Sequence, residues 1–233
     1  MCRSTAEVSR AGTTTFDRMV LGPRSMQRHI SVLREVQMIK IEPATLHRSD
    51  DPRLSAISAA LVGERLVAAR YAVPAGVSWE GYGGLEHVHE VDMGVELVTE
   101  SGLVLGLSWS TPGREEGLSL ALDRAGECPS NELIDLVDVS GQSEWSRVLG
   151  RLVEVVGVSF HVHADDSSIR PWAFRIGASG GTSVTVALGE VSDNVLRYMP
   201  DNIVVIFDEA VAREYQIPSS SQAAWGEIVR NRG

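Results

Sequence analysis

The feature that most constrains the fold of this 233-residue chain is that several segments occur twice, in the same order. The first is an apolar stretch that ends at a glycine and continues into strand-like residues. The second is a strand–turn–strand sequence with glycine in the turn, and the third is a short apolar strand that ends on aspartate. Their copies lie at 60–73 and 147–160, at 93–109 and 172–188, and at 117–123 and 202–208. Repetition in a fixed order indicates an architecture built from two related units.

Each unit has the pattern of one helix followed by four strands. We expect the first unit at about 52–124 and the second at about 143–215, both within a single domain that spans 37–217. Most connections inside a unit are short, which favours antiparallel pairing of consecutive strands. The predicted fold class is therefore α+β. Strands with one inward face each can close into a barrel-like sheet or stack as two sheets, and the pattern leaves both arrangements open.

Three local signals concern helices. Asp50 and Asp51 precede Pro52, as is typical of a helix N-terminus. The segment 130–150 is expected to form one or two short helices, and Asp208 is expected to cap a short helix near the end of the domain. Helices are thus a minor part of the predicted fold.

The strands are predicted from alternation with a period of two residues. Residues 87–99 are expected to form one strand, because odd-numbered histidine and apolar side chains alternate with acidic ones, and the odd face is assigned to the interior. In 103–110 the leucines and Trp109 face inward by the same rule. The segment 202–207 is apolar on both faces, which predicts a strand covered on both sides.

The ends of the chain and its charge limit the functional classes. Residues 1–36 lack periodicity and are expected to form a disordered N-terminal arm, and 218–233 a C-terminal tail. The formal net charge of −10 argues against binding to nucleic acid or to an anionic membrane. The two cysteines, Cys2 and Cys128, are not expected to form a disulfide, so a reducing cytoplasm is the expected location.

The segments LVGERLVAARYAV, HEVDMGVELVTESG and YMPDNIVVIFDE resemble parts of an uncharacterised family of proteins from Streptomyces and related actinobacteria. The resemblance covers most of residues 54–215. Lys40 is the only lysine among 21 basic residues, a bias that is typical of GC-rich genomes of this kind. The resemblance implies a single domain and carries no known activity.

Two identical tripeptides contain four of the six histidines, His87 and His89 in the first and His161 and His163 in the second. Two residues at i and i+2 of a strand project to one side, about 6–7 Å apart, which suits two imidazoles that bind one divalent metal ion. His87 and His89 share the inward face with apolar residues. His161 and His163 share a face with Gly157 and Ser159, which indicates that this pair points to solvent.

The loop before the first histidine pair contains Trp79 and Tyr82 among glycines. A flexible aromatic loop beside inward histidines can cover an apolar ligand. We therefore assign His87 and His89 as candidate catalytic residues. The candidate ligand-binding residues are Trp79, Tyr82, Met93 and Trp109.

Three functional hypotheses follow. The first is a protein that binds a small hydrophobic molecule without a cofactor, in its enzymatic form a cyclase or isomerase of secondary metabolism that works by orienting its substrate. The second is a metal-dependent enzyme that uses both histidine pairs. The third is a non-enzymatic immunity or regulatory protein whose acidic surface binds a basic partner. A homodimer is compatible with the first hypothesis.

Overall fold

The computed structural model describes residues 38–46, 50–80, 84–110, 116–124, 132–163, 169–215 and 221–228, with only the backbone described at 161–163 and 221–228. The N-terminal arm predicted for 1–36 lies outside the described residues. Among the helices of these ranges, none combines the length and the apolar character that crossing a membrane requires.

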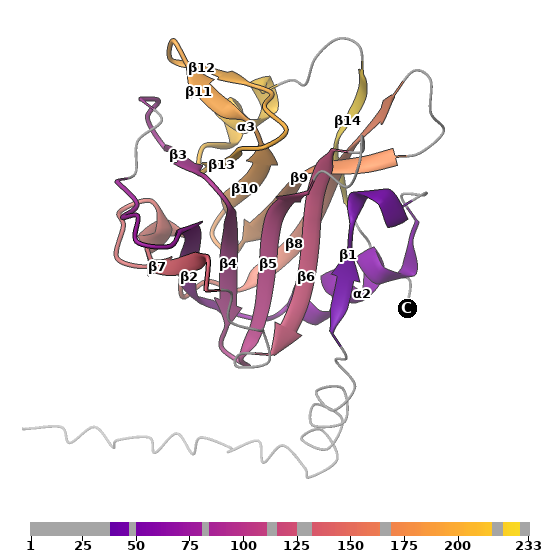
Figure 1. Ribbon diagram of the computed structural model, residues 1–233. Coiled ribbons are helices and arrows are strands. Elements are labelled where there is room, and N and C mark those ends of the chain that lie inside the picture. Colours follow the sequence, from indigo (N-terminus) through magenta and orange to yellow (C-terminus); the bar gives the residue numbers. More distant parts are fainter. Residues whose placement is uncertain are drawn as a thin grey trace, which may run out of the picture. The chain divides into compact units, whose positions relative to one another are not determined.

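The described strands form two six-stranded sheets and a two-stranded hairpin (Figure 1). The first sheet has the order β1 (Ile39–Ile41), β6 (Gly117–Arg124), β5 (Leu103–Ser110), β4 (Gly94–Thr99), β2 (Leu66–Pro74) and β7 (Ile134–Asp138). The second has the order β14 (Ser221–Ile228), β8 (Val153–His163), β9 (Ile169–Ala178), β10 (Thr182–Leu188), β13 (Ile203–Ile206) and β3 (Val88–Val91). All pairings are antiparallel.

Of the two predicted arrangements, the two-sheet one is found. Each sheet keeps two edge strands among the described residues, β1 and β7 in the first and β14 and β3 in the second, so the barrel-like alternative is wrong. Strand β6 of the first sheet contacts β9 and β10 of the second, and the inward side chains of both sheets form one interior. β14 lies within the segment predicted as a C-terminal tail.

The inward face predicted for the leucines of β5 is confirmed, and the neighbouring strands have the same alternation. The leucines of β5 and β6 and the aromatic and aliphatic residues of β9 and β10 alternate into the interior, where they are almost fully buried. They are Leu103, Leu105, Leu107, Leu118, Leu120, Leu122, Trp172, Phe174, Ile176, Val184, Val186 and Leu188. All four residues of β13 are buried, as predicted for a strand covered on both sides, and α3 (Glu209–Glu214) contacts this strand.

The duplicated helix-plus-four-strand unit is not shown by the structure. The helix α2 (Pro52–Leu61) precedes β2, whereas only a 3₁₀ turn, η2 (Trp145–Arg147), precedes β8. The prediction of one or two short helices over 130–150 is confirmed only by η2, a 3₁₀ helix of three residues, because the first part of the segment forms the strand β7. The open edge of β2 offers β7 a row of backbone partners, and this tertiary pairing overrides the local pattern.

The helix caps are confirmed. The Asp51 side chain accepts a hydrogen bond from the backbone N–H of Arg53 at the start of α2, and Asp208 accepts from Ala210 and Val211 at the start of α3. Three further short elements complete the described fold. They are η1 (Pro43–Thr45), β11 (Glu190–Ser192) and β12 (Val195–Arg197).

The single strand predicted over 87–99 is wrong. The chain bends between β3 and β4, so that β3 pairs with β13 in the second sheet and β4 pairs with β2 and β5 in the first. The apolar alternation continues through the bend, and the sequence pattern therefore does not reveal it. The consequence is that the chain crosses here from one sheet to the other, with Gly94 as the first residue after the crossing.

Gly94 is expected to be essential for this crossing. A Cβ at this position would lie 2.8 Å from the backbone oxygen of Leu107, which is fixed in the neighbouring strand. We expect Gly94→Ala to lower the free energy of unfolding by about 1–3 kcal/mol, the usual cost of overpacking. The matched control is Gly106→Ala, whose Cβ would meet nothing closer than 3.9 Å and which should change stability by less than about 0.5 kcal/mol. Urea unfolding of both variants checks this, and equal effects would contradict it.

Candidate functional site

Five rings meet where the two sheets approach each other, and we call them the aromatic cluster. They are Tyr71, Trp79, His89, Trp145 and Phe207. Tyr71 comes from β2 of the first sheet, His89 from β3 of the second, and Trp145 from η2 between the sheets. The centroid of the Phe207 ring lies 4.9 Å from that of His89 and 4.9 Å from that of Trp145. The cluster exists because the crossing after β3 brings His89 back over β2.

A chain of hydrogen bonds runs through this cluster. The Trp145 Nε1–H group can only donate, and it donates to the Tyr71 hydroxyl oxygen over 2.9 Å. The Tyr71 hydroxyl lies 2.8 Å from His89 Nδ1 and therefore donates its own hydrogen to that nitrogen. Neutral His89 consequently carries its proton on Nε2. Burial raises the pKa of Tyr71 far above its usual value, so the hydroxyl stays protonated.

A carboxylate and a second histidine lie at the outer side of the cluster. Glu144 Oε2 lies 3.6 Å from His89 Nε2, and Glu144 Oε1 lies 3.8 Å from His87 Nδ1. Burial lowers the pKa of His89, an effect that Glu144 partly opposes. A hydrogen bond from Ser143 lowers the pKa of Glu144. His87 has a φ of 63°, in the left-handed region that non-glycine residues seldom adopt.

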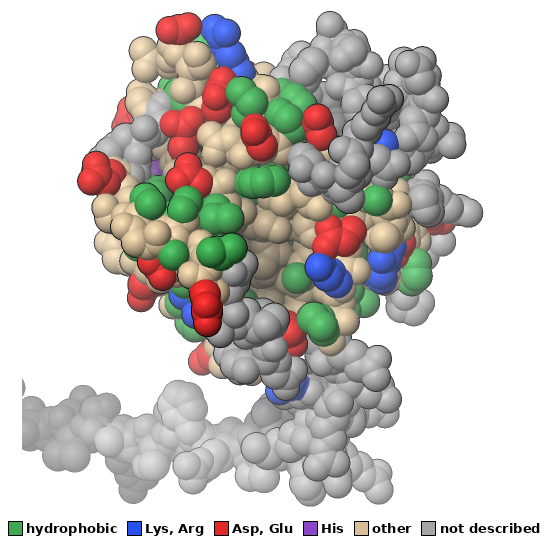
Figure 2. All heavy atoms as spheres, viewed as in Figure 1, with side chains coloured by type: hydrophobic (Ala, Val, Ile, Leu, Met, Phe, Trp, Pro, Cys, Tyr) green, Lys and Arg blue, Asp and Glu red, His purple; other side chains and the backbone are tan. Residues whose placement is uncertain are grey.

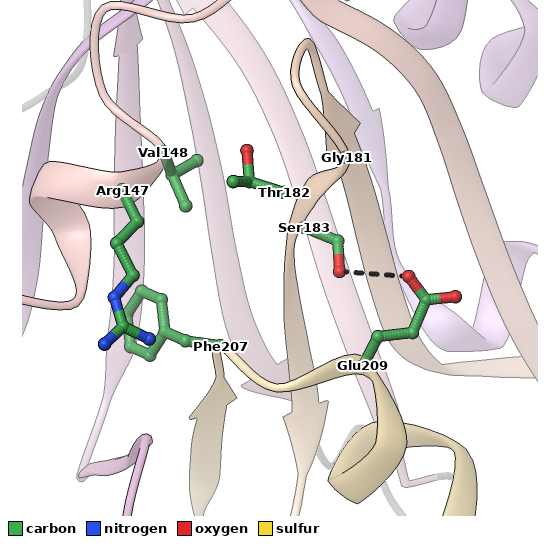
Figure 3. Close-up of a pocket in the computed structure, with 7 residues that line it drawn as sticks. All are labelled: Arg147, Val148, Gly181, Thr182, Ser183, Phe207 and Glu209. Carbon is green, nitrogen blue, oxygen red and sulfur yellow. Dashed lines mark hydrogen bonds between the residues drawn. The ribbon is translucent and has the colours of Figure 1, made fainter.

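Phe207 of the aromatic cluster also lines a small pocket with a volume of about 160 Å³ (Figure 3). It is lined by Arg147, Val148, Gly181, Thr182, Ser183, Phe207 and Glu209. These residues come from η2 and the position after it, from the start of β10, and from the connection between β13 and α3. In Figure 3, Arg147 and Phe207 lie on one side of the pocket and Ser183 and Glu209 on the other.

The polar groups of the pocket differ in whether they already form hydrogen bonds or ion pairs with other side chains. Glu209 accepts from Arg175 over 2.6 Å and from Arg213 over 2.5 Å, and Ser183 Oγ lies 3.4 Å from it. Hydrogen bonding by Arg213 is the main cause that lowers the pKa of Glu209. By contrast, no carboxylate among the described residues pairs with the exposed Arg147 guanidinium. The buried Thr182 hydroxyl likewise has no hydrogen-bond partner within the described ranges.

The structure places the sequence-predicted residues as follows. His89 is buried in the aromatic cluster and His87 is half-buried at its rim. Trp79 packs on Tyr71 and His89 and donates to the backbone oxygen of Glu90 over 2.8 Å. Trp79 is thus part of the cluster, whereas none of the described candidates lines the pocket.

Three further candidates lie elsewhere. Trp109 keeps the strand face of the inward leucines, opposite the buried Leu118, but it lies half-exposed near the end of β5 and donates to the backbone oxygen of Asp92 over 2.7 Å. The bend after β3 removes Met93 from the strand face it was assigned to and leaves it half-buried. Tyr82 lies outside the described residues.

The two histidine pairs do not meet. His161 and His163 lie in β8, and β9, β10 and β13 separate that strand from β3 with His89. Four inter-strand steps correspond to roughly 19 Å, so one ion cannot contact both pairs. No group of three or more His, Cys, Asp or Glu side chains within the described part of the chain has the arrangement of a metal site. A divalent metal ion at either pair alone stays a prediction.

Sequence reasoning missed Arg147, Thr182, Phe207 and Glu209, which the fold brings into one pocket. No family model matches the chain, and neither the curated proteins nor the solved structures include a match to it. The resemblance to actinobacterial proteins therefore stays a prediction. The geometry of the pocket and the cluster is the evidence from which function is inferred below.

The pH dependence of stability tests the environment of His89. The ordinary histidine pKa is 6.5, and burial keeps the pKa of His89 lower in the folded chain. As the pH falls from about 8 through 6.5, the unfolded chain therefore takes up a proton at this residue first, and the free energy of unfolding decreases. His89→Asn removes this titration and retains an acceptor for Tyr71. We expect the variant to be less stable than the wild type at pH 8, with a difference that shrinks toward pH 5.5 in urea unfolding.

The control is Tyr71→Phe, which removes the hydroxyl and leaves His89 able to titrate. It should lower stability at every pH while keeping the slope of the wild type. If His89→Asn and Tyr71→Phe showed the same slope between pH 8 and 5.5, the assignment of that slope to His89 would be wrong.

Proposed function

We propose that this protein binds a small organic molecule in the pocket between η2, the start of β10 and the segment after β13. The observation that carries the proposal is the combination of an aromatic wall, Phe207, with polar groups that no other part of the described fold uses. These groups are the Arg147 guanidinium and the Thr182 hydroxyl. Ligand sites typically combine an apolar lining with a few such polar groups.

The volume of the pocket limits the size of the ligand. Pockets for drug-sized molecules have volumes of about 300–1,000 Å³. The pocket here has about 160 Å³, close to an engineered cavity of about 150 Å³ that binds benzene. The ligand we propose is therefore the size of a single ring with one substituent, smaller than the substrate a barrel-like cyclase would enclose.

The charges of the pocket support binding more than acid–base catalysis. Glu209 is the carboxylate among the lining residues, and its two arginine partners keep its pKa low, which makes it a weak base. His89 packs against Phe207 and is not among the residues that line the pocket. Catalysis as a cyclase or isomerase remains the narrower form of the proposal, and it would have to rest on orientation alone.

Protein recognition is a second candidate, favoured by the edge strand β7. Backbone hydrogen bonds join Leu133 to Ala75 and Val139 to Ala69, so odd-numbered residues of this segment point their backbone groups at β2. Leu136 therefore directs its N–H and C=O away from β2, and its side chain is 44% exposed between Asp135 and Asp138. On the side where Figure 1 places β7, Figure 2 shows apolar side chains among acidic ones. Such an edge suits a basic strand from a partner.

Filling the pocket tests the first proposal. We expect a panel of neutral and charged single-ring compounds, measured by ligand-observed NMR, to include binders with Kd values of roughly 0.1–10 mM, the range for about ten heavy atoms. Thr182→Phe places a ring in the pocket and should abolish this binding. The matched control, Val195→Phe, adds a ring at an exposed position on β12 and should leave it unchanged. Absence of any binder, or binding that survives Thr182→Phe, would refute the proposal.

Blocking the edge of β7 tests the second candidate. A synthetic peptide of alternating lysine and valine should bind the wild type, more weakly as NaCl is raised. Leu136→Pro removes an outward N–H without breaking a bond to β2 and should abolish binding, whereas Leu136→Thr should retain it. Binding that Leu136→Pro does not affect would exclude this edge. Self-association of the wild type that Leu136→Pro abolishes would instead assign the edge to a homodimer.

A further inference from the structure

We infer that the ligand of the pocket is a monocarboxylate, with its carboxylate on Arg147 and its apolar ring against Phe207. This inference rests on the proposed function, since it names the chemical class of the molecule that the pocket binds. It goes beyond that function in assigning a role to each end of the pocket (Figure 3).

The first step concerns the balance of charge at the pocket. Glu209 is surrounded by Arg175 and Arg213, whose donors occupy both of its carboxylate oxygens. Arg147 adds a third guanidinium at the opposite side of the pocket. Because the charge of Glu209 is already offset by its two arginine partners, the Arg147 guanidinium is the charge that a ligand of this pocket can pair with. A guanidinium favours an anionic ligand.

The second step concerns which groups are free to bind a ligand. An amine would have to displace an arginine from Glu209, because that carboxylate already accepts bonds of 2.6 Å and 2.5 Å. The Arg147 guanidinium has no carboxylate partner within the described ranges, so it is available without any such displacement. A guanidinium binds a carboxylate through two parallel N–H···O bonds, which are charge-assisted and therefore strong.

The third step concerns the Thr182 hydroxyl. Its oxygen is shielded from solvent and has no hydrogen-bond partner within the described part of the chain, an arrangement that is costly for a polar atom. A second polar substituent of the ligand would have to accept its hydrogen, because Figure 3 shows this hydroxyl pointing away from the Arg147 guanidinium, so that one carboxylate does not reach both groups.

The fourth step concerns the uncharged part of the ligand. Phe207 and Val148 provide the apolar lining, and Phe207 is fixed from behind by His89 and Trp145. With about 160 Å³ in total, one carboxylate leaves space for a single ring. Phosphate also fits an arginine fork, but its larger tetrahedral group leaves less room for that ring, so we assign the carboxylate.

The test compares four probes of the same ring size by NMR titration: benzoate, benzamide, benzylamine and phenyl phosphate. Benzoate should bind about 5–10-fold more tightly than neutral benzamide, a modest factor because Arg147 is exposed. Arg147→Gln should remove this preference and leave the affinity for benzamide unchanged. Arg197→Gln, a matched loss of an exposed arginine on β12, should retain the preference.

The outcomes separate this inference from the function on which it rests. If none of the four probes binds, the proposed function itself is wrong. If benzamide binds as tightly as benzoate, or benzylamine binds most tightly, the pocket binds small rings but the assignment of a carboxylate is wrong. Tighter binding of phenyl phosphate than of benzoate would also overturn it. A benzoate preference that survives Arg147→Gln would refute the role of Arg147.

Discussion

The Tyr71 hydroxyl is the contact on which the rest of the structure depends. It accepts a hydrogen bond from Trp145 and donates one to His89, and so it links a strand of the first sheet to a strand of the second and to the turn between them. All three rings are buried, and each of these polar atoms would cost about 1–3 kcal/mol if left without a partner. The relative positions of β2, β3 and η2 are thereby fixed within narrow limits.

The pocket is a consequence of the same contact. Trp145 fixes η2, which carries Arg147 two residues later, and Trp145 and His89 together support the ring of Phe207. Asp208 then caps α3 and places Glu209 in the first turn of this helix, where it meets Arg175 from β9. His89, the buried histidine predicted as catalytic, packs against the ring of Phe207 and does not line the pocket.

The sequence predicted those features of the fold that depend on residues close together in the chain. Alternation of leucines predicted the inward face of β5, the aspartates before α2 and α3 predicted their caps, and His89 was correctly assigned to the interior. The bend between β3 and β4 was missed because the alternation continues across it. The pocket was missed because its residues come from three distant segments, each with an ordinary pattern of its own. A periodic pattern within one segment does not predict which side chains of separate segments will line the same pocket.

The acidic surface and the Arg147 guanidinium act over different distances. A formal net charge of −10 repels an anion in bulk solution, but at physiological ionic strength this repulsion is screened within about 8 Å. A carboxylate at hydrogen-bond distance from Arg147 would be attracted by the positive charge of the guanidinium. Glu209 would repel it little, because Arg175 and Arg213 offset the charge of Glu209. The charge that we propose for the ligand is therefore set by contacts inside the pocket. The net charge instead affects the association with large partners, because many surface charges then act together. Binding of a basic partner at the acidic edge of β7 would be an association of this kind.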